Sequence, residues 1–163
     1  MEKVLRNFIA FVMLLIMTPA CGQSFADMPE PVGIINDFED RFTDEQEKAL
    51  DSIIAIGNKV ADIRISVVTL DSAYTSKESF DMYTLDLANY WSIGDHDKQN
   101  GILIAFSDEL RHIRIHNGYS IEKRMTDETT RMIIDKYFVP YFKDGKYYIG
   151  MVEGVQAIIE HLR

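Results

Sequence analysis

Oxygen-bearing side chains gather around a predicted β-hairpin, and their chemistry suits a hard metal ion. The apolar stretch 101–106 and the more polar stretch 111–116 are separated only by residues 107–110, too few for a crossover helix, so we predict two antiparallel strands. The start of the first strand and the end of the second then lie at one edge of the sheet. Calcium and magnesium prefer several oxygen ligands from different loops. The side chains that could supply them at this edge are Asp95, Asp97, Asn100, Glu122 and Asp127.

Two further acids, Asp37 and Asp40, precede the first predicted helix and would join the site if their loop crosses the same edge. The alternative is that all these acids are solvated loop residues or helix caps, since the chain contains 26 acidic residues. Asp127 in particular lies at the start of a predicted helix. The predicted metal ligands are Asp37, Asp97, Asp127, Glu122 and Asn100.

Other catalytic signatures are absent from the sequence. It contains no nucleophile elbow, no glycine-rich phosphate loop and no paired-histidine metal motif. His112, Arg114 and His116 share one face of the second hairpin strand, a pattern typical of an exposed edge strand. Catalytic residues therefore stay unassigned, and an enzyme here would have to use carboxylates together with a metal.

The remaining periodicity predicts elements that hold the hairpin. Thr43 is placed to cap a helix that ends near Ala61, and the β-branched run 63–70 follows as a strand. Helical spacing returns over 76–91, 128–138 and 150–162, the last two separated by Pro140 and Gly145. Stretch 101–106 is apolar on both faces, as in a central strand covered by helices. The predicted fold is a three-layer α/β/α sandwich with a small mixed sheet that includes the hairpin and is flanked by helices on both faces.

The first twenty residues have the pattern of a secretory signal. Lys3 and Arg6 precede the apolar stretch 8–17, which as a helix would be roughly 15 Å long, about half of a bilayer core of about 30 Å. We therefore predict a signal peptide over 1–20, a tether over 21–31 and one domain over 32–163. The expected location is the bacterial periplasm or cell envelope.

Two cleavage sites remain open. Residues 18–21 (TPAC) resemble a lipobox, which would make Cys21 the lipidated first residue of the mature protein. Ser24 to Ala26 instead fits an ordinary signal peptidase site, and a cut after Ala26 would remove the only cysteine. Membrane contact is expected only through such a lipid anchor.

The charge of the chain limits its partners. The formal net charge is −9, so nucleic acids and anionic membrane surfaces are poor partners, whereas divalent cations are compatible ones.

An ordered series of short motifs over residues 32–162 resembles the TPM domain, a family of bacterial periplasmic and thylakoid-lumen proteins. No single motif is diagnostic, but their order and spacing are fairly specific. The matching segments are 35–38 (INDF), 42–43 (FT), 91–94 (WSIG), 100–103 (NGIL), 111–115 (RHIRI), 118–122 (GYSIE), 126–127 (TD) and 140–150.

The resemblance implies a sheet between helices, in agreement with the periodicity. For function it implies either a metal-binding acid phosphatase or a factor that assembles or maintains a membrane protein complex. Two departures stand out. Gln99 occupies a position where the family usually has Asp, and Ser120 replaces a Gly.

Two functions therefore remain in view. The first is an exported domain that binds calcium or magnesium at the acidic edge and hydrolyses phosphomonoesters with that metal. The second is a non-catalytic envelope module that assists a membrane protein complex.

Overall fold

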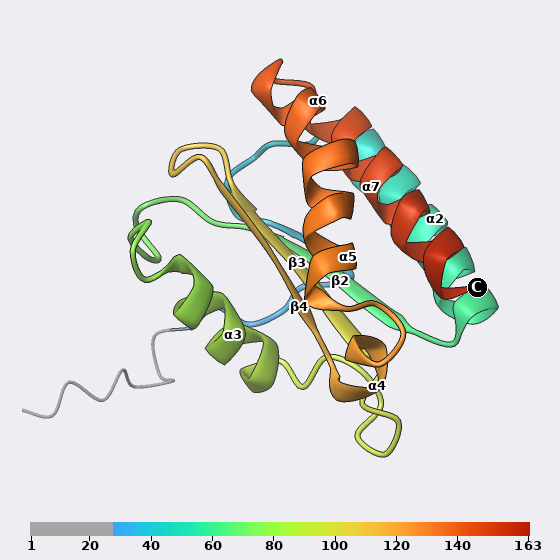
Figure 1. The fold of residues 1–163 in the computed structure, drawn as a ribbon. Coiled ribbons are helices and arrows are strands. Elements are labelled where there is room, and N and C mark those ends of the chain that lie inside the picture. The colour runs from blue at the N-terminus through green and yellow to red at the C-terminus, as the bar shows by residue number, and fades with distance from the viewer. Residues whose placement is uncertain (1–27) are drawn as a thin grey trace, which may run out of the picture.

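A four-stranded sheet forms the centre of the computed structural model, which describes residues 28–163 (Figure 1). The strand order is β1 (Ile35–Asp37), β2 (Arg64–Thr69), β3 (Gly101–Ser107) and β4 (His112–Asn117). The first three strands are parallel and β4 is antiparallel to β3, which confirms the predicted hairpin and the mixed sheet. The short strand β1 is not among the predicted elements.

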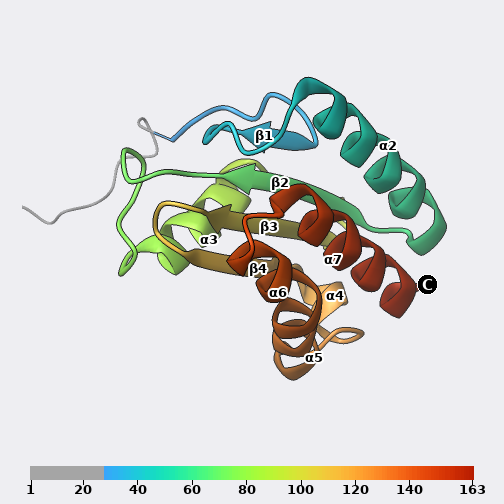
Figure 2. The ribbon, with the colours of Figure 1, turned by 90° about the horizontal axis from the view of Figure 1, so that it is seen from above.

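Helices cover both faces of this sheet, as predicted. Figure 1 shows α3 (Phe80–Tyr90) on one face and α2 (Asp44–Ala61) with α7 (Tyr147–Leu162) on the other. Figure 2 shows α2 near β1 and α5 near β4, with α7 between them. The remaining helical segments are α4 (Tyr119–Glu122), α5 (Asp127–Ile133), the π-helix η2 (Ile134–Phe138) and α6 (Val139–Lys143).

Alternation along β3 explains the two layers of core. All of its residues are buried. Ile102, Ile104 and Phe106 join the core beneath α2 and α7, whereas Leu103 and Ala105 join the core beneath α3. Successive side chains of a strand point to opposite faces, so an unbroken apolar run places β3 at the centre of the sandwich.

Helix α2 begins where its capping residues predict. The Thr43 hydroxyl accepts a hydrogen bond from the Gln46 amide, and the Gln46 side chain accepts one from the Thr43 amide, which satisfies two otherwise unpaired helix donors. Asp62 ends the helix in the left-handed conformation. This end leads directly into β2.

The predicted break at Pro140 is wrong. Helical structure continues from Asp127 through η2 into α6 and ends at Lys143. Pro140 lies near the start of α6, directly after the π-helix η2, where the regular α-helical hydrogen-bond pattern is already interrupted. Gly145, with φ of 72°, then separates α6 from α7.

The described chain begins alongside α3. Met28 packs into the core beneath that helix, and Trp91 Nε1 donates a hydrogen bond to the carbonyl of Pro29 at 2.7 Å. The predicted signal peptide, both cleavage sites and Cys21 lie outside the described residues. Within residues 28–163, no helix has the length and apolar character needed to span a membrane.

Replacement of Gly154 by Ala should destabilise the protein. A Cβ atom there would lie 2.0 Å from the Phe138 ring, which is fully buried, so α7 and η2 must separate. Overpacking of this kind costs about 1–3 kcal/mol, which exceeds the gain of ~1 kcal/mol from the higher helix propensity of Ala. Urea unfolding of Gly154→Ala and of the control Gly33→Ala, whose Cβ would meet no atom closer than 3.7 Å, measures the difference. Equal stability of the two variants would contradict this packing.

Candidate functional site

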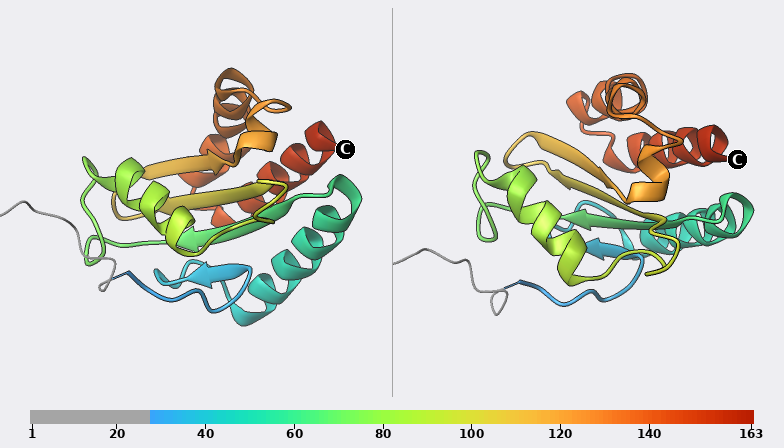
Figure 3. Two further views of the ribbon diagram at one scale, coloured as in Figure 1. Left: turned by 90° about the horizontal axis from the view of Figure 1, so that it is seen from below. Right: turned by 60° about the horizontal axis from the view of Figure 1, so that its bottom comes forward.

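The candidate functional residues lie at two opposite ends of the sheet, whose strands Figure 3 shows in two views. We call the carboxyl ends of β1, β2 and β3, together with the β3–β4 turn, the carboxyl edge. We call the amino end of β3, together with the end of β4 and α4, the amino edge. The predicted metal ligands divide between these two edges.

At the amino edge, the side chain of Asn100 is hydrogen-bonded to backbone groups. Its side-chain oxygen accepts a hydrogen bond from the Asp95 amide at 2.9 Å, and its side-chain nitrogen donates to the Asp62 carbonyl at 2.8 Å. Asn100 is almost completely buried, so its amide needs these partners. Its principal role in this structure is to hold the loop that precedes β3.

The acids of the same edge are more exposed. Asp95 accepts hydrogen bonds from the amides of Asp97 and Lys98, and Lys98 forms an ion pair with Asp62 at 2.8 Å. The Asp97 side chain is 99% exposed. Glu122 is exposed on α4, and Asp127 is the first residue of α5. The cap of α5 is Thr126, whose hydroxyl accepts from the Thr129 amide, so Asp127 is not the N-cap.

Asp37 lies at the carboxyl edge. Asp37 of β1 lies beside Thr69 of β2, and Thr69 lies beside Phe106 near the end of β3. Asn100 lies just before Gly101, at the other end of β3. The intervening strand spans roughly 20 Å at ~3.3 Å per residue, while the ligands of calcium lie about 2.3–2.6 Å from the ion. One ion therefore cannot bind Asp37 together with Asn100, and the predicted grouping of Asp37 with the amino edge is wrong.

The carboxylates of the carboxyl edge are also committed to other partners. Asp37 accepts hydrogen bonds from the Phe42 amide at 2.7 Å and from the Thr69 hydroxyl at 2.5 Å. Glu109 accepts two from Ser72. Within residues 28–163, no three or more Asp, Glu, His or Cys side chains are grouped so that they could hold a metal ion. Metal binding by the predicted ligands therefore stays a prediction.

Glu39 is a structurally important residue that sequence analysis missed. Its carboxylate accepts hydrogen bonds from the amides of Asp108 and Glu109, both at 2.9 Å, and the Glu39 amide donates to the Thr69 hydroxyl. Only 9% of Glu39 is exposed. It fixes the β3–β4 turn from a distant part of the chain, and no local pattern reveals that contact.

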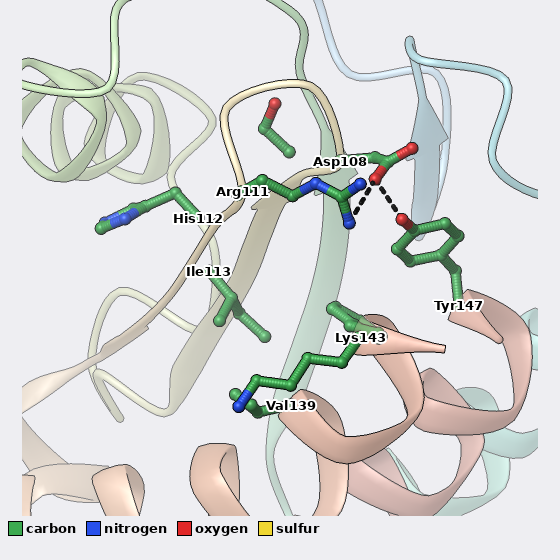
Figure 4. Close-up of a pocket in the computed structure, with 9 residues that line it drawn as sticks. Asp108, Arg111, His112, Ile113, Val139, Lys143 and Tyr147 are labelled. Carbon is green, nitrogen blue, oxygen red and sulfur yellow. Dashed lines mark hydrogen bonds and ion pairs between the residues drawn. The ribbon is translucent and has the colours of Figure 1, made fainter. Parts of the chain in front are cut away.

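The turn presents Asp108 to three donors, two of which, Arg111 and Tyr147, are drawn in Figure 4. Arg41 Nη1 lies 3.0 Å from one carboxylate oxygen, Arg111 Nη1 lies 3.4 Å from the other, and the Tyr147 hydroxyl donates to Asp108 as well. Burial, followed by the hydrogen bond to Asp108, raises the pKa of Tyr147 to about 12. Tyr147 therefore stays neutral at physiological pH and keeps its proton as a hydrogen-bond donor.

A hollow of about 180 Å³ lies between this turn, α6 and the start of α7. Figure 4 shows Arg111 and Tyr147 directed at Asp108, with the Lys143 side chain extending from α6 toward Val139. Lys143 is exposed and forms no hydrogen bond or ion pair with another described residue. We call this hollow the Asp108 pocket, and its lining residues are Ser107, Asp108, Arg111, His112, Ile113, Val139, Phe142, Lys143 and Tyr147.

The family model of the TPM domain matches residues 35–161. The chain belongs to the TPM domain family. No curated protein matches the chain.

Solved structures share this fold. The N-terminal domain of a protein from P. gingivalis is 26% identical with a TM-score of 0.67, covering 79% of this chain and 81% of that chain. The BA42 protein from the psychrophilic bacterium Bizionia argentinensis is 24% identical with a TM-score of 0.63, covering 77% and 83%. The N-terminal domain of the cg2496 protein from Corynebacterium glutamicum is 14% identical with a TM-score of 0.60, covering 83% and 84%.

The hairpin histidines of this TPM domain are not on an exposed face, contrary to the sequence prediction. Helix α3 packs across them. His112 Nε2 lies 2.8 Å from Asp81 and its ring contacts Phe80, while His116 Nε2 lies 2.8 Å from the Thr84 hydroxyl. Burial, followed by the charge of Arg114, lowers the pKa of His116 to about 4, so His116 is a neutral packing residue.

Tyr147→Phe should remove a late step from the alkaline titration. The pKa of Tyr147 is raised from 10 to about 12, so folding favours the neutral form. Its contribution to stability is complete below pH 10 and is lost as the pH rises through 12. Tyrosinate absorbance should therefore contain a component near pH 12 that is absent in Tyr147→Phe and present in Tyr119→Phe, whose ring is 61% exposed. Identical titrations of wild type and Tyr147→Phe would refute the assignment.

Proposed function

We propose that this TPM domain is exported to the cell envelope and binds the phosphoryl group of a phosphomonoester in the Asp108 pocket. The observation that carries the proposal is that Arg111 and Lys143 line one small hollow. Charged N–H donors of this kind are groups that bind phosphate oxygens in proteins.

The sign of the local charge supports an anionic ligand. Two cations, Arg111 and Lys143, and one carboxylate, Asp108, are the charged side chains that line the pocket. The pocket is therefore positive in a chain whose formal net charge is −9. A local field opposite to that of the whole molecule raises the concentration of anions at that site.

Of the two cations in the pocket, Lys143 is the more available to an anionic ligand, because the carboxylate of Asp108 already pairs with the arginines. Asp108 already neutralises part of the charge of Arg41 and Arg111. Lys143 has no partner within the described chain, so its ammonium group can turn to an incoming anion without breaking an ion pair. Arg111 can keep one donor on Asp108 and direct another into the pocket, because a guanidinium group carries five N–H donors.

The size of the pocket limits what enters it. Pockets for larger ligands typically measure about 300–1,000 Å³, whereas this one measures about 180 Å³. A phosphoryl group fits inside, and the remainder of the ligand would lie along the surface formed by α6 and the hairpin.

A more specific form of this proposal is that the domain hydrolyses the phosphomonoester. It requires a group that activates water or attacks phosphorus, and a proton for the leaving group. His112 is the nearest candidate base, but its Nε2 contacts Asp81, and Tyr147 with a pKa of about 12 is a donor and not a base. These commitments favour a second candidate, a non-catalytic envelope module that recognises a phosphorylated ligand or partner in a membrane protein complex.

Export rests on the N-terminal sequence alone, with its basic residues and its apolar stretch 8–17. Anchoring at Cys21 is part of the proposal. The intact mass of the protein recovered from the envelope tests it: a lipidated chain starting at Cys21 supports anchoring, and a chain starting at Asp27 refutes it.

Lys143→Gln should weaken phosphate binding in the full chain. We expect an affinity loss of about tenfold for phenyl phosphate, the loss that follows when one charge-assisted hydrogen bond disappears. Lys146→Gln is the matched control, because Lys146 is exposed nearby but pairs with Asp144 outside the pocket. Calorimetric titration measures both variants, and equal binding by Lys143→Gln and Lys146→Gln would overturn the proposal.

The same proteins decide between catalysis and binding. Turnover of para-nitrophenyl phosphate that is reduced in Lys143→Gln would establish a phosphatase. Assays with and without magnesium or calcium test the predicted cofactor. Binding of phenyl phosphate without any turnover would leave the non-catalytic module as the function.

A further inference from the structure

Strand β4 has a free edge. It is the last strand of the sheet, and among the described residues it pairs only with β3. The Gly118 amide donates to the Gly101 carbonyl, which sets the alternation of the antiparallel ladder. In that alternation Arg114 exchanges hydrogen bonds with β3, so the amides and carbonyls of Ile113 and Ile115 point away from the sheet. No hydrogen bond within residues 28–163 reaches these outward groups.

A hollow of about 230 Å³ lies along this edge and is lined by residues of α3, β4, α5 and η2. We call it the β4 groove, and the lining residues used below are Asp81, Ile113, Arg114, Ile115, Arg131 and Ile134. Unpaired backbone groups at a sheet edge are a template for a further strand. A groove that leaves them accessible is the arrangement by which proteins bind extended peptides.

The position of α5 selects a single strand as the occupant. Figures 2 and 3 show α5 on the far side of β4 from β3, and Asn117 of β4 donates to the Thr130 hydroxyl of α5 at 2.9 Å. A second copy of the domain that offered its own β4 would bring its own helical layers and would meet α5. An extended segment carries no helical layer, so it can enter between α5 and the strand edge.

The side of the groove that faces α5 is apolar. The Ile113 and Ile115 side chains point to this side and belong to the core there, with Ile134 packed against the same core. A residue placed directly opposite Ile113 or Ile115 on an added strand points to the same face as they do. Two β-branched apolar residues, spaced two apart, are therefore favoured in the segment.

The side that faces α3 presents Arg114, whose side chain is 47% exposed. Asp81 divides its two oxygens between His112 Nε2 at 2.8 Å and Arg114 Nη1 at 3.9 Å. The guanidinium group has five N–H donors and keeps some for a second carboxylate. On the other wall Arg131 and Asp127 offset one another in charge. Arg114 therefore favours an acidic residue directly opposite to it, as in other cross-strand pairs.

We infer that the β4 groove binds an extended peptide segment in which an acidic residue lies between two β-branched apolar residues. The segment adds to the sheet as an antiparallel fifth strand. Its apolar residues exchange backbone hydrogen bonds with Ile113 and Ile115, and its acid pairs with Arg114 across a non-hydrogen-bonded position, where facing side chains are closest. The inference does not rest on phosphate binding in the Asp108 pocket.

The test is a titration of the isotope-labelled full chain with the capped peptide TVEVT, followed by backbone amide shifts. We expect saturable shifts of the Ile113 and Ile115 amides, which gain hydrogen bonds, and none in α2. The capped peptide TVKVT should bind about fivefold more weakly because its lysine lies opposite Arg114. TVEVT with both valines N-methylated lacks the backbone donors and should not bind.

Two variants separate charge recognition from loss of folding. Arg114→Gln changes a half-exposed side chain, so the amide spectrum should stay dispersed, while TVEVT and TVKVT should bind it equally. Lys48→Gln removes an exposed cation on α2 and should keep the preference for TVEVT.

Three outcomes would overturn the inference. The first is the absence of saturable shifts with TVEVT, and the second is equal binding of TVEVT and TVKVT by the wild type. The third is a shift of the Ile113 and Ile115 amides when the protein concentration is raised without peptide, which would assign this edge to a second copy of the chain.

Discussion

The buried carboxylate of Glu39 holds the carboxyl edge together. A charge removed from water is costly unless hydrogen bonds compensate it, and Glu39 receives them from the amides of Asp108 and Glu109. Its own amide is held by Thr69, whose hydroxyl donates to Asp37. A continuous polar chain therefore links the ends of β1, β2 and β3 and fixes the turn that carries Asp108. The positions of Arg111 and Tyr147 around the pocket depend on this turn.

Much of the fold follows from local sequence. The unbroken apolar run of β3 and the short connection to β4 predict the hairpin, and the capping pair Thr43 and Gln46 predicts the start of α2. β1 was missed because three residues are too few to display a period of two. The continuity through Pro140 was missed because proline in a first turn and proline as a helix breaker look alike in sequence.

The site was harder to predict because its contacts are distant in sequence. The placement of Arg111 at the end opposite to Asp97 follows from the hairpin alone. The parallel pairing of β1 with β2, which brings Asp37 to the edge of Arg111, needs the whole sheet. The bond between Tyr147 and Asp108 joins positions 39 residues apart and depends on how α7 returns along the sheet. Residue types alone therefore suggested a metal site at the amino edge, whereas the structure places arginine and lysine side chains near the carboxyl edge.

The central claim is that the Asp108 pocket is an oxyanion site, and a crystal structure of the full chain soaked in tungstate tests it most directly. Tungstate resembles phosphate in shape and charge, and its density is unmistakable. The account predicts tungstate in the pocket, contacted by Lys143 and Arg111. Tungstate bound elsewhere on the protein, with none in this pocket, would contradict it.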